Sequence, residues 1–321
     1  MTSSTIEGLG IILFGPGGYV FAGILGGIVG SFINVAAIRM PKGLSVVRPG
    51  SHCMNCKTPI AFYDNIPILS YLILRGKCRK CKKSFSPTYA IVELIMAVLG
   101  VLCLQHSKGF AEGDPLLLIA HFLTELSFCG VLATLAIIDL RTWILPDVIT
   151  YPSTLFFWGA AVSLGRLDWG DALAGAGLGF GALAVVILGY KMLTGRDGMG
   201  WGDAKLLAAA GAFLGWQALP LIVFLAAIQG ILVAMLLALT QTSLEPVEPY
   251  VPLEGSPEEE NSENAEENRN SKDEDLTNEE PEEAEPPKTW RHAAMPFGPF
   301  LALASIETLF LGPFFFFEFF L

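Results

Sequence analysis

The chain has 321 residues, of which 52% are apolar and only 16% are charged, and its mean hydropathy is +0.53. These values exclude an ordinary soluble globular domain and indicate a membrane protein. The formal net charge of −11 has a local origin, because residues 245–288 hold 17 acidic and 3 basic side chains.

Eight apolar stretches are candidates for membrane helices, which need about 20 residues each. In chain order they are 17–38, 89–105, 116–138, 148–165, 172–193, 204–217, 219–240 and 295–319. Two of them contain glycine-rich sequences, GILGGIVGS at 23–31 and GAGLGFGALA at 175–184, that suit close packing between helices. We therefore predict an all-α polytopic membrane protein with about eight transmembrane helices.

The basic residues give these helices an orientation. The first stretch has no basic residue before Arg39 and no convincing cleavage site, so we expect it to be retained rather than removed as a signal. Ten basic residues follow it within residues 39–88, which places this loop in the cytoplasm. Eight alternating spans then leave only Lys108 and Arg166 on the outer side.

The same loop holds four of the six cysteines, arranged as two C-x2-C pairs with 21 residues between the pairs. They are Cys53, Cys56, Cys78 and Cys81. Four thiolates at this spacing can surround a Zn²⁺ ion, and the neighbouring lysines and arginines help to keep the thiols deprotonated. Two disulfides are the alternative, which a reducing cytoplasm disfavours. No fifth ligand stands nearby, so we predict a small cytoplasmic zinc-binding domain with a structural metal ion.

Two acidic residues stand where predicted helices meet the cytoplasm. Asp139 ends the apolar run FCGVLATLAIID, and Asp203 lies in GMGWGDAKLL at 198–207, just before another run. An ionised carboxylate at membrane depth is costly. An ion pair with Arg141 would explain Asp139, and a helix N-cap would explain Asp203; an N-cap is also the favoured interpretation of Asp147.

Capping does not explain the glycines around Asp203. Gly198, Gly200 and Gly202 would let an extended peptide approach closely, and Lys205 is a further candidate for substrate approach. Because Asp139 and Asp203 are predicted at the same inner end, they can meet. Two carboxylates that share one site do not both ionise easily, so one activates water while the other, still protonated, polarises a carbonyl group, as in aspartic proteases.

From these residues alone, three functions stay open. The chain could be a peptidase, an ion-coupled transporter that uses intramembrane carboxylates, or a non-catalytic zinc-ribbon scaffold of a secretion complex. A transporter needs its carboxylates near the bilayer midplane, and a scaffold has no need for two convergent aspartates.

Six segments together resemble the type IV prepilin leader peptidases, which are membrane aspartyl peptidases of type IV pilus and type II secretion systems. The segments are GSFINVAAIRMP (30–41), YDNIPILSYLILRGKCRKC (63–81), SPTYAIVELI (86–95), AIIDLRTWILPDVIT (136–150), GMGWGDAKLLAAAGAFLGW (198–216) and MPFGPFLALA (295–304). The resemblance implies that Asp139 and Asp203 are catalytic and that the four cysteines bind Zn²⁺.

The resemblance also implies two reactions at the cytoplasmic face of the bacterial inner membrane. The first removes the short basic leader from prepilins or pseudopilins, and the second methylates the new N-terminal residue with S-adenosylmethionine. Glu93, Asp64 and Asn65 are candidates for the methyl transfer. The expected partners are these substrates and the lipid bilayer, with no nucleic acid.

The resulting domain organisation has five parts. They are a first transmembrane helix (1–38), the zinc-binding domain (39–88), a peptidase core (89–243), an acidic disordered cytoplasmic linker (244–290) and a last transmembrane helix (291–321). The linker departs from the family's pattern. A solvated spacer is the favoured interpretation, and attraction of the basic leader by the acidic side chains is a further hypothesis.

Overall fold

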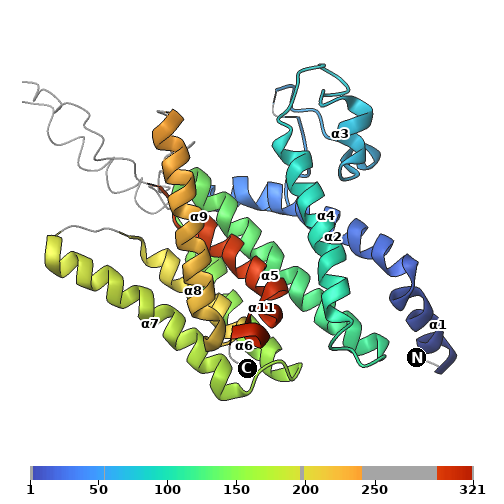
Figure 1. The fold of residues 1–321 in the computed structure, drawn as a ribbon. Helices are drawn as coiled ribbons and strands as arrows, with labels where there is room; N and C mark the ends of the chain where they lie inside the picture. The colour runs from blue at the N-terminus through green and yellow to red at the C-terminus, as the bar shows by residue number, and fades with distance from the viewer. Residues whose placement is uncertain (1–2, 54, 196–198, 241–294, 320–321) are drawn as a thin grey trace, which may run out of the picture.

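The computed structural model of the chain describes residues 3–53, 55–195, 199–240 and 295–319 (Figure 1). This part of the chain is mostly helical, as predicted. The helices are α1 (Ser3–Phe14), α2 (Pro16–Arg39), α3 (Leu69–Leu74), α4 (Thr88–Ser107), α5 (Pro115–Thr142), α6 (Asp147–Ser163), α7 (Trp169–Thr194), α8 (Trp201–Leu214), α9 (Leu219–Thr240) and α11 (Gly298–Phe319). The predicted linker at 244–290 lies outside the described residues.

Five of these helices are long and apolar enough to cross a membrane, namely α2, α4, α5, α7 and α9. The apolar part of α11 runs from Gly298 to Gly312, whereas α6 and α8 have 17 and 14 residues. Helices therefore stand at all eight predicted positions, but only five of them have the length and composition of a complete span.

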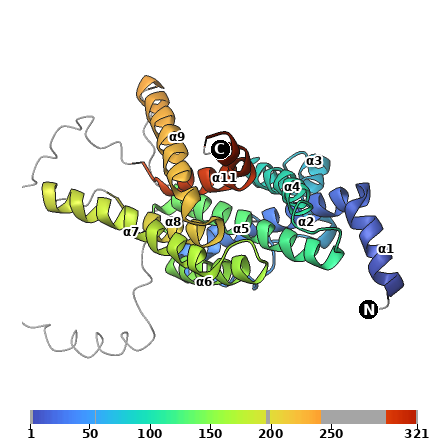
Figure 2. The ribbon, with the colours of Figure 1, turned by 60° about the horizontal axis from the view of Figure 1, so that its bottom comes forward.

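The shortest of the eight, α8, is also the most enclosed. It packs against α6, α7 and α11, and its residues from Leu206 to Phe213 are all buried (Figure 2). A helix of 14 residues is only about 21 Å long, which is shorter than the hydrocarbon core of a bilayer. Because neighbouring helices cover α8 on several sides, it is positioned by protein contacts along most of its length.

The glycine-rich sequences allow two helix pairs to approach closely, as predicted. A Cβ added at Gly175 of α7 would lie 2.1 Å from the carbonyl oxygen of Gly211 in α8. On the other side of the molecule, a Cβ at Gly26 of α2 would lie 2.2 Å from the carbonyl oxygen of Met96 in α4. No side chain fits at these positions, so glycine sets the distance between the helix backbones.

A cluster of buried charges joins α4 and α5 to the turn between α6 and α7. The carboxylate of Glu125 is fully buried and accepts hydrogen bonds from Arg166 at 2.5 Å and from Ser107 at 3.0 Å, and it lies 2.8 Å from Nδ1 of His106. The Arg166 guanidinium also stacks on the ring of Phe213 in α8. Glu125 was not identified from the sequence, although an acidic residue inside an apolar run is itself a signal of a partnered polar group.

Candidate active site

Asp139 and Asp203 both lie close to Gly298. A Cβ added at Gly298 would lie 2.5 Å from Oδ2 of Asp139 and 3.3 Å from Oδ1 of Asp203. Both carboxylate oxygens are thus within 3.3 Å of one point. The two side chains are only 5% and 6% exposed. The structure therefore brings together two residues that are 64 positions apart in the sequence, in an enclosed site that one water molecule can bridge.

Three helix ends place these residues. Asp139 stands in the last turn of α5, which ends when Trp143 adopts a left-handed conformation and its N–H donates to the Asp139 carbonyl oxygen. Asp203 is the third residue of α8, and Gly298 is the first residue of α11. The pair thus lies beside the N-terminal ends of α8 and α11, whose N–H groups favour negative charge, and at the C-terminal end of α5, whose carbonyl groups oppose it.

One oxygen of the pair is available for a ligand. Oδ2 of Asp139 is buried and has no hydrogen-bond partner among the described residues. The backbone N–H of Gly298 faces the same carboxylate. Buried acceptors are nearly always satisfied, so this oxygen fits a site that binds water or a substrate N–H group.

The described residues do not show the N-cap or the ion pair that would give these aspartates a purely structural role. The N-cap of α8 is Gly200 rather than Asp203. Arg141 makes no ion pair with Asp139 among the described interactions. The N-cap interpretation of Asp147 is wrong, because α6 begins at Asp147 itself and its N-cap is Pro146.

The other residues predicted around Asp203 have separate contacts. Lys205 donates to Oδ1 of Asp147 at 2.5 Å and lies over the ring of Tyr151, so it ties α8 to α6. A Cβ added at Gly202 would lie 2.7 Å from Cβ of Leu145, so close packing against Leu145 explains why this residue is a glycine. Gly200 is exposed and has room for a side chain. Gly198 lies outside the described residues.

Gly298 was not identified as a site residue from the sequence. It belongs to MPFGPFLALA, a segment that follows the acidic stretch and was noted only for its resemblance to the family. A glycine at the start of the last helix was the available signal. Its contact with the aspartates follows from the packing of α11 on α5 and α8, which local sequence does not encode.

The four cysteines come together as predicted. The sulfur atoms of Cys53, Cys56, Cys78 and Cys81 all lie within 4.8 Å of one another, and none is in a disulfide. The Cys53–Cys81 and Cys56–Cys78 sulfur distances are 3.8 and 3.9 Å. A tetrahedron with Zn–S bonds of about 2.3 Å has edges of about 3.8 Å, so the cluster fits Zn²⁺ closely.

Two matching turns build this cluster. In the first, the N–H of Lys57 donates to the Cys53 carbonyl oxygen; in the second, the N–H of Lys82 donates to that of Cys78. Both lysines have positive φ angles, of 54° and 58°. The hydroxyl and the backbone amide of Thr58 stabilise the Cys56 thiolate and lower the pKa of this thiol to about 6. A thiolate is the form that binds metal.

Two of the three candidates for methyl transfer accept hydrogen bonds from the loop between α2 and α4. Both oxygens of Asp64 accept hydrogen bonds from Arg79, at 2.6 and 2.7 Å. Oε2 of Glu93 accepts from the N–H of Ile68 at 2.7 Å. Asn65 ends the short 3₁₀ helix that contains Asp64. These contacts use only part of the acceptor capacity of each carboxylate, so both keep lone pairs for a further hydrogen-bond donor.

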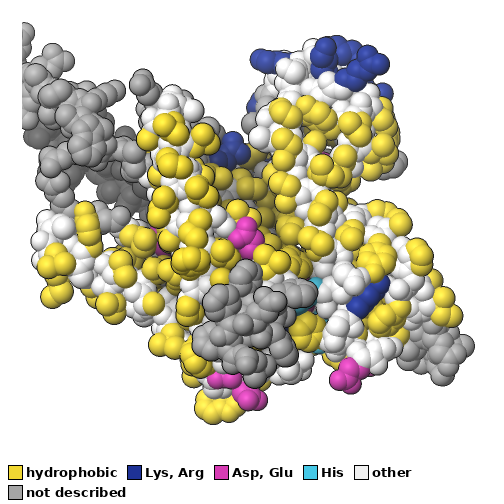
Figure 3. Space-filling model, viewed as in Figure 1, with side chains coloured by type: hydrophobic (Ala, Val, Ile, Leu, Met, Phe, Trp, Pro, Cys, Tyr) yellow, Lys and Arg dark blue, Asp and Glu magenta, His cyan; other side chains and the backbone are white. Residues whose placement is uncertain are grey.

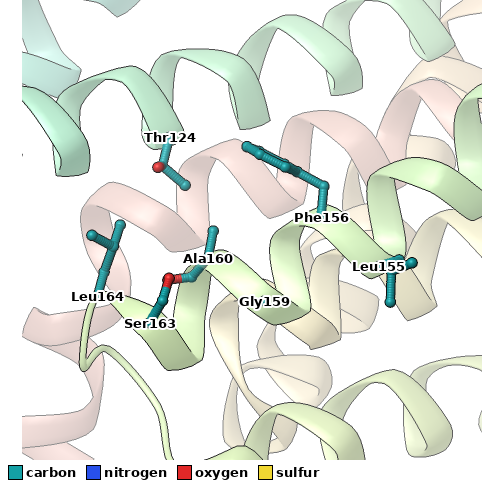
Figure 4. Close-up of a pocket in the computed structure, with 7 residues that line it drawn as sticks. All are labelled: Thr124, Leu155, Phe156, Gly159, Ala160, Ser163 and Leu164. Carbon is teal, nitrogen blue, oxygen red and sulfur yellow. The ribbon is translucent and has the colours of Figure 1, made fainter.

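Two lateral pockets lie away from the aspartates. The one in Figure 4 lies between α5 and α6, has a volume of about 430 Å³, and is lined mostly by apolar atoms. The hydroxyls of Thr124 and Ser163 on its wall already donate to backbone carbonyl oxygens. The second pocket, of about 500 Å³, lies between α6, α7 and α8. The first pocket is lined by no titratable side chain, and the second is lined by Tyr151 and by Lys205, which is bonded to Asp147.

Two parts of the chain match known protein families. Residues 24–107 match the family model described as the bacterial peptidase A24 N-terminal domain, and residues 126–235 match the type IV leader peptidase family. No solved structure gives a significant match to the chain.

Several curated proteins are similar over most of the chain. A prepilin leader peptidase/N-methyltransferase of Myxococcus xanthus (strain DK1622) is 36% identical, and the match covers 98% of this chain and 95% of that protein. Proteins of the same name from Aeromonas hydrophila and Klebsiella pneumoniae are 36% and 39% identical, with 71% and 61% of this chain and 85% of each relative covered.

Proposed function

Because the chain belongs to the type IV leader peptidase family, we propose that it cleaves the leader from prepilins with Asp139 and Asp203 and methylates the new N-terminus. The observation that carries the first part is the convergence of the two carboxylates on Gly298. The family resemblance of the N-terminal region carries the second part.

The proposed hydrolysis uses the aspartate pair as one acid–base unit. The ionised carboxylate takes a proton from a bridging water, whose oxygen attacks the scissile carbonyl carbon. The protonated carboxyl donates a hydrogen bond to the carbonyl oxygen and so stabilises the charge that develops there. The proton held by the first carboxylate then passes to the leaving nitrogen, which becomes the new amino terminus. We assign these roles to the pair and not to one member, since the two carboxyls titrate together.

The proposed topology places this reaction at the cytoplasmic face of the inner membrane. Eight spans, α2, α4, α5, α6, α7, α8, α9 and α11, alternate across the bilayer. The basic residues between α2 and α4 put that loop inside. Asp139, at the end of α5, is then on the same side as this loop. A basic leader would meet the pair there, while the hydrophobic segment of the substrate stays in the bilayer.

The four-cysteine domain is the proposed methyl-transfer unit. Cys53, Cys56, Cys78 and Cys81 would hold Zn²⁺, which when bound joins the two turns into one rigid platform. S-adenosylmethionine would supply the methyl group. The carboxylates of Asp64 and Glu93 support the domain through Arg79 and Ile68, so we propose that they position this unit.

Co-expression with a prepilin tests both reactions separately. Intact-mass measurement of the product is expected to show the loss of the leader and the gain of one methyl group. The Asp203→Asn variant is expected to leave the precursor at full mass. A prepilin that is processed equally by the chain and by this variant would refute the proposed peptidase.

A further inference from the structure

The short helix α3 lies in the four-cysteine domain (residues 39–88). It exposes apolar side chains and buries a polar one, the reverse of what is expected for a helix in water. It buries Ser70, whose hydroxyl donates to the Tyr63 carbonyl oxygen. Leu69, Leu72 and Ile73 point outward and are 48%, 65% and 65% exposed. Such a contiguous apolar surface is unfavourable in water and indicates a missing apolar partner.

The contacts of Pro67 and Ile68, which precede α3, show how far along α2 and α4 this helix begins. Ile68, the residue before α3, donates its N–H to Glu93, which is the sixth residue of α4 and therefore about 8 Å along that helix. A Cβ added at Gly27 of α2 would lie 3.3 Å from Cβ of Pro67. Gly27 is 12 residues before the end of α2 at Arg39, or about 18 Å along the helix.

Both contacts lie within helices that have the length and composition to span a membrane. After the first cysteine turn, the chain therefore runs back to the side of α2 and α4 before α3 starts. Both helices also expose apolar side chains of their own, among them Ile28 of α2 and Leu94 and Ile95 of α4.

Basic side chains follow α3 at once. They are exposed and comprise Arg75, Lys77, Arg79, Lys80, Lys82 and Lys83. Figure 3 shows Lys and Arg gathered at the far end of this domain, with hydrophobic side chains between them and the transmembrane helices. An apolar face next to a dense basic face is the pattern of elements that lie in the membrane interface and bind anionic lipids.

We propose that α3 is inserted into the cytoplasmic leaflet, with Leu69, Leu72 and Ile73 among the acyl chains and the basic residues at 75–83 against anionic phospholipid headgroups. The inference uses the orientation given under the proposed function. It adds that the four-cysteine domain is held at the membrane surface, close to the level at which a cleaved substrate presents its new amino terminus.

Site-specific photo-crosslinking in lipid nanodiscs tests the insertion. A benzophenone amino acid replaces Leu72 or Ile73 in the full chain, and the control is Asn55, which is exposed and belongs to neither the apolar nor the basic residues of the proposal. We expect phospholipid adducts at Leu72 and Ile73 and at least severalfold weaker ones at Asn55. An unchanged gel-filtration profile and thermal unfolding midpoint show that each variant is folded.

The lipid composition tests the second half of the proposal. In nanodiscs of mixed phosphatidylglycerol and phosphatidylcholine, we expect the adducts to be enriched in phosphatidylglycerol relative to its share of the bilayer. Adducts only with a prepilin or with a second copy of the chain, or no lipid adduct at Leu72 and Ile73, would overturn the insertion. Unselective adducts would overturn the role of the basic residues. None of these results depends on which reaction the chain catalyses, so failure here is distinguishable from failure of the proposed function.

Discussion

Gly298 lies so close to Asp139 that any side chain at this position would displace the carboxylate. The 2.5 Å between a Cβ at Gly298 and Oδ2 of Asp139 is well inside van der Waals contact, and Oδ1 of Asp203 is only 3.3 Å from the same Cβ. The first residue of α11 therefore forms one wall of the aspartate site, although it is separated from both aspartates by long stretches of chain.

Gly298→Ala is therefore expected to reduce leader cleavage by roughly 10²-fold while the protein still folds, because the added methyl group pushes Asp139 out of position. The rate is measured on a purified prepilin in detergent. Gly181→Ala on α7 is the matched control, since no atom lies within 4 Å of a Cβ there. Equal activity of the two alanine variants would contradict the proposed wall.

Asp139→Asn and Asp203→Asn are each expected to lower the cleavage rate by about 10²–10⁴-fold, since an amide keeps the shape of the side chain but cannot exchange protons with water and substrate. The control is Asp114→Asn at the other end of α5. Asp114 caps that helix by accepting from the N–H of Leu116, and asparagine caps a helix equally well. Substantial cleavage by either site variant would remove that aspartate from the mechanism.

The zinc cluster predicts a specific loss of metal. Cys53→Ser removes one of four thiolates and is expected to lower the zinc content of the purified protein from one ion per chain to a small fraction of that. Cys103→Ala, which alters a buried cysteine in α4, is expected to leave the zinc content unchanged. Metal content is measured by elemental mass spectrometry. Full zinc in the Cys53 variant would show that the four sulfur atoms are not a metal site.

The contacts of Thr58 with the Cys56 thiol predict how zinc binding depends on pH. Its hydroxyl and backbone amide keep the pKa of the Cys56 thiol at about 6, below the ordinary value of 9.0. Thr58→Val removes the hydroxyl, so the pKa should rise and protons should compete with zinc at a higher pH. The expected result is an upward shift of the pH midpoint for zinc release, measured by titration with a chromophoric chelator. An unchanged or lower midpoint would contradict the assigned role of the hydroxyl.

The buried charge cluster predicts a stability effect that depends on both partners. Glu125→Leu leaves the Arg166 guanidinium, whose side chain is only 9% exposed, without its carboxylate. We expect the free energy of unfolding to fall by about 3–5 kcal/mol, and the double variant Glu125→Leu/Arg166→Met to recover much of that loss. Denaturant unfolding in detergent measures both. The pair is not coupled if the loss in the double variant equals the sum of the losses in Glu125→Leu and Arg166→Met.

Local sequence was sufficient for several features of this protein. Hydropathy located the apolar helices, because each span has to be apolar along its own length. The C-x2-C spacing predicted the sulfur cluster, because each cysteine pair is held by the same two local backbone hydrogen bonds. The glycine-rich stretches predicted close helix packing, since helices without side chains at the contact can pack at short distance, whereas the structure identified the pairs as α7 with α8 and α2 with α4.

The aspartate site needed the tertiary structure. Sequence placed Asp139 and Asp203 at helix ends and, through the family resemblance, made them a pair, but it could not show that α11 brings Gly298 between them. The same limit applies to Glu125, whose partners come from α4 and from the turn between α6 and α7, and to α3, whose apolar face has meaning only beside α2 and α4. Contacts between distant residues depend on how whole helices pack, and that packing is set by many weak interactions spread over the chain.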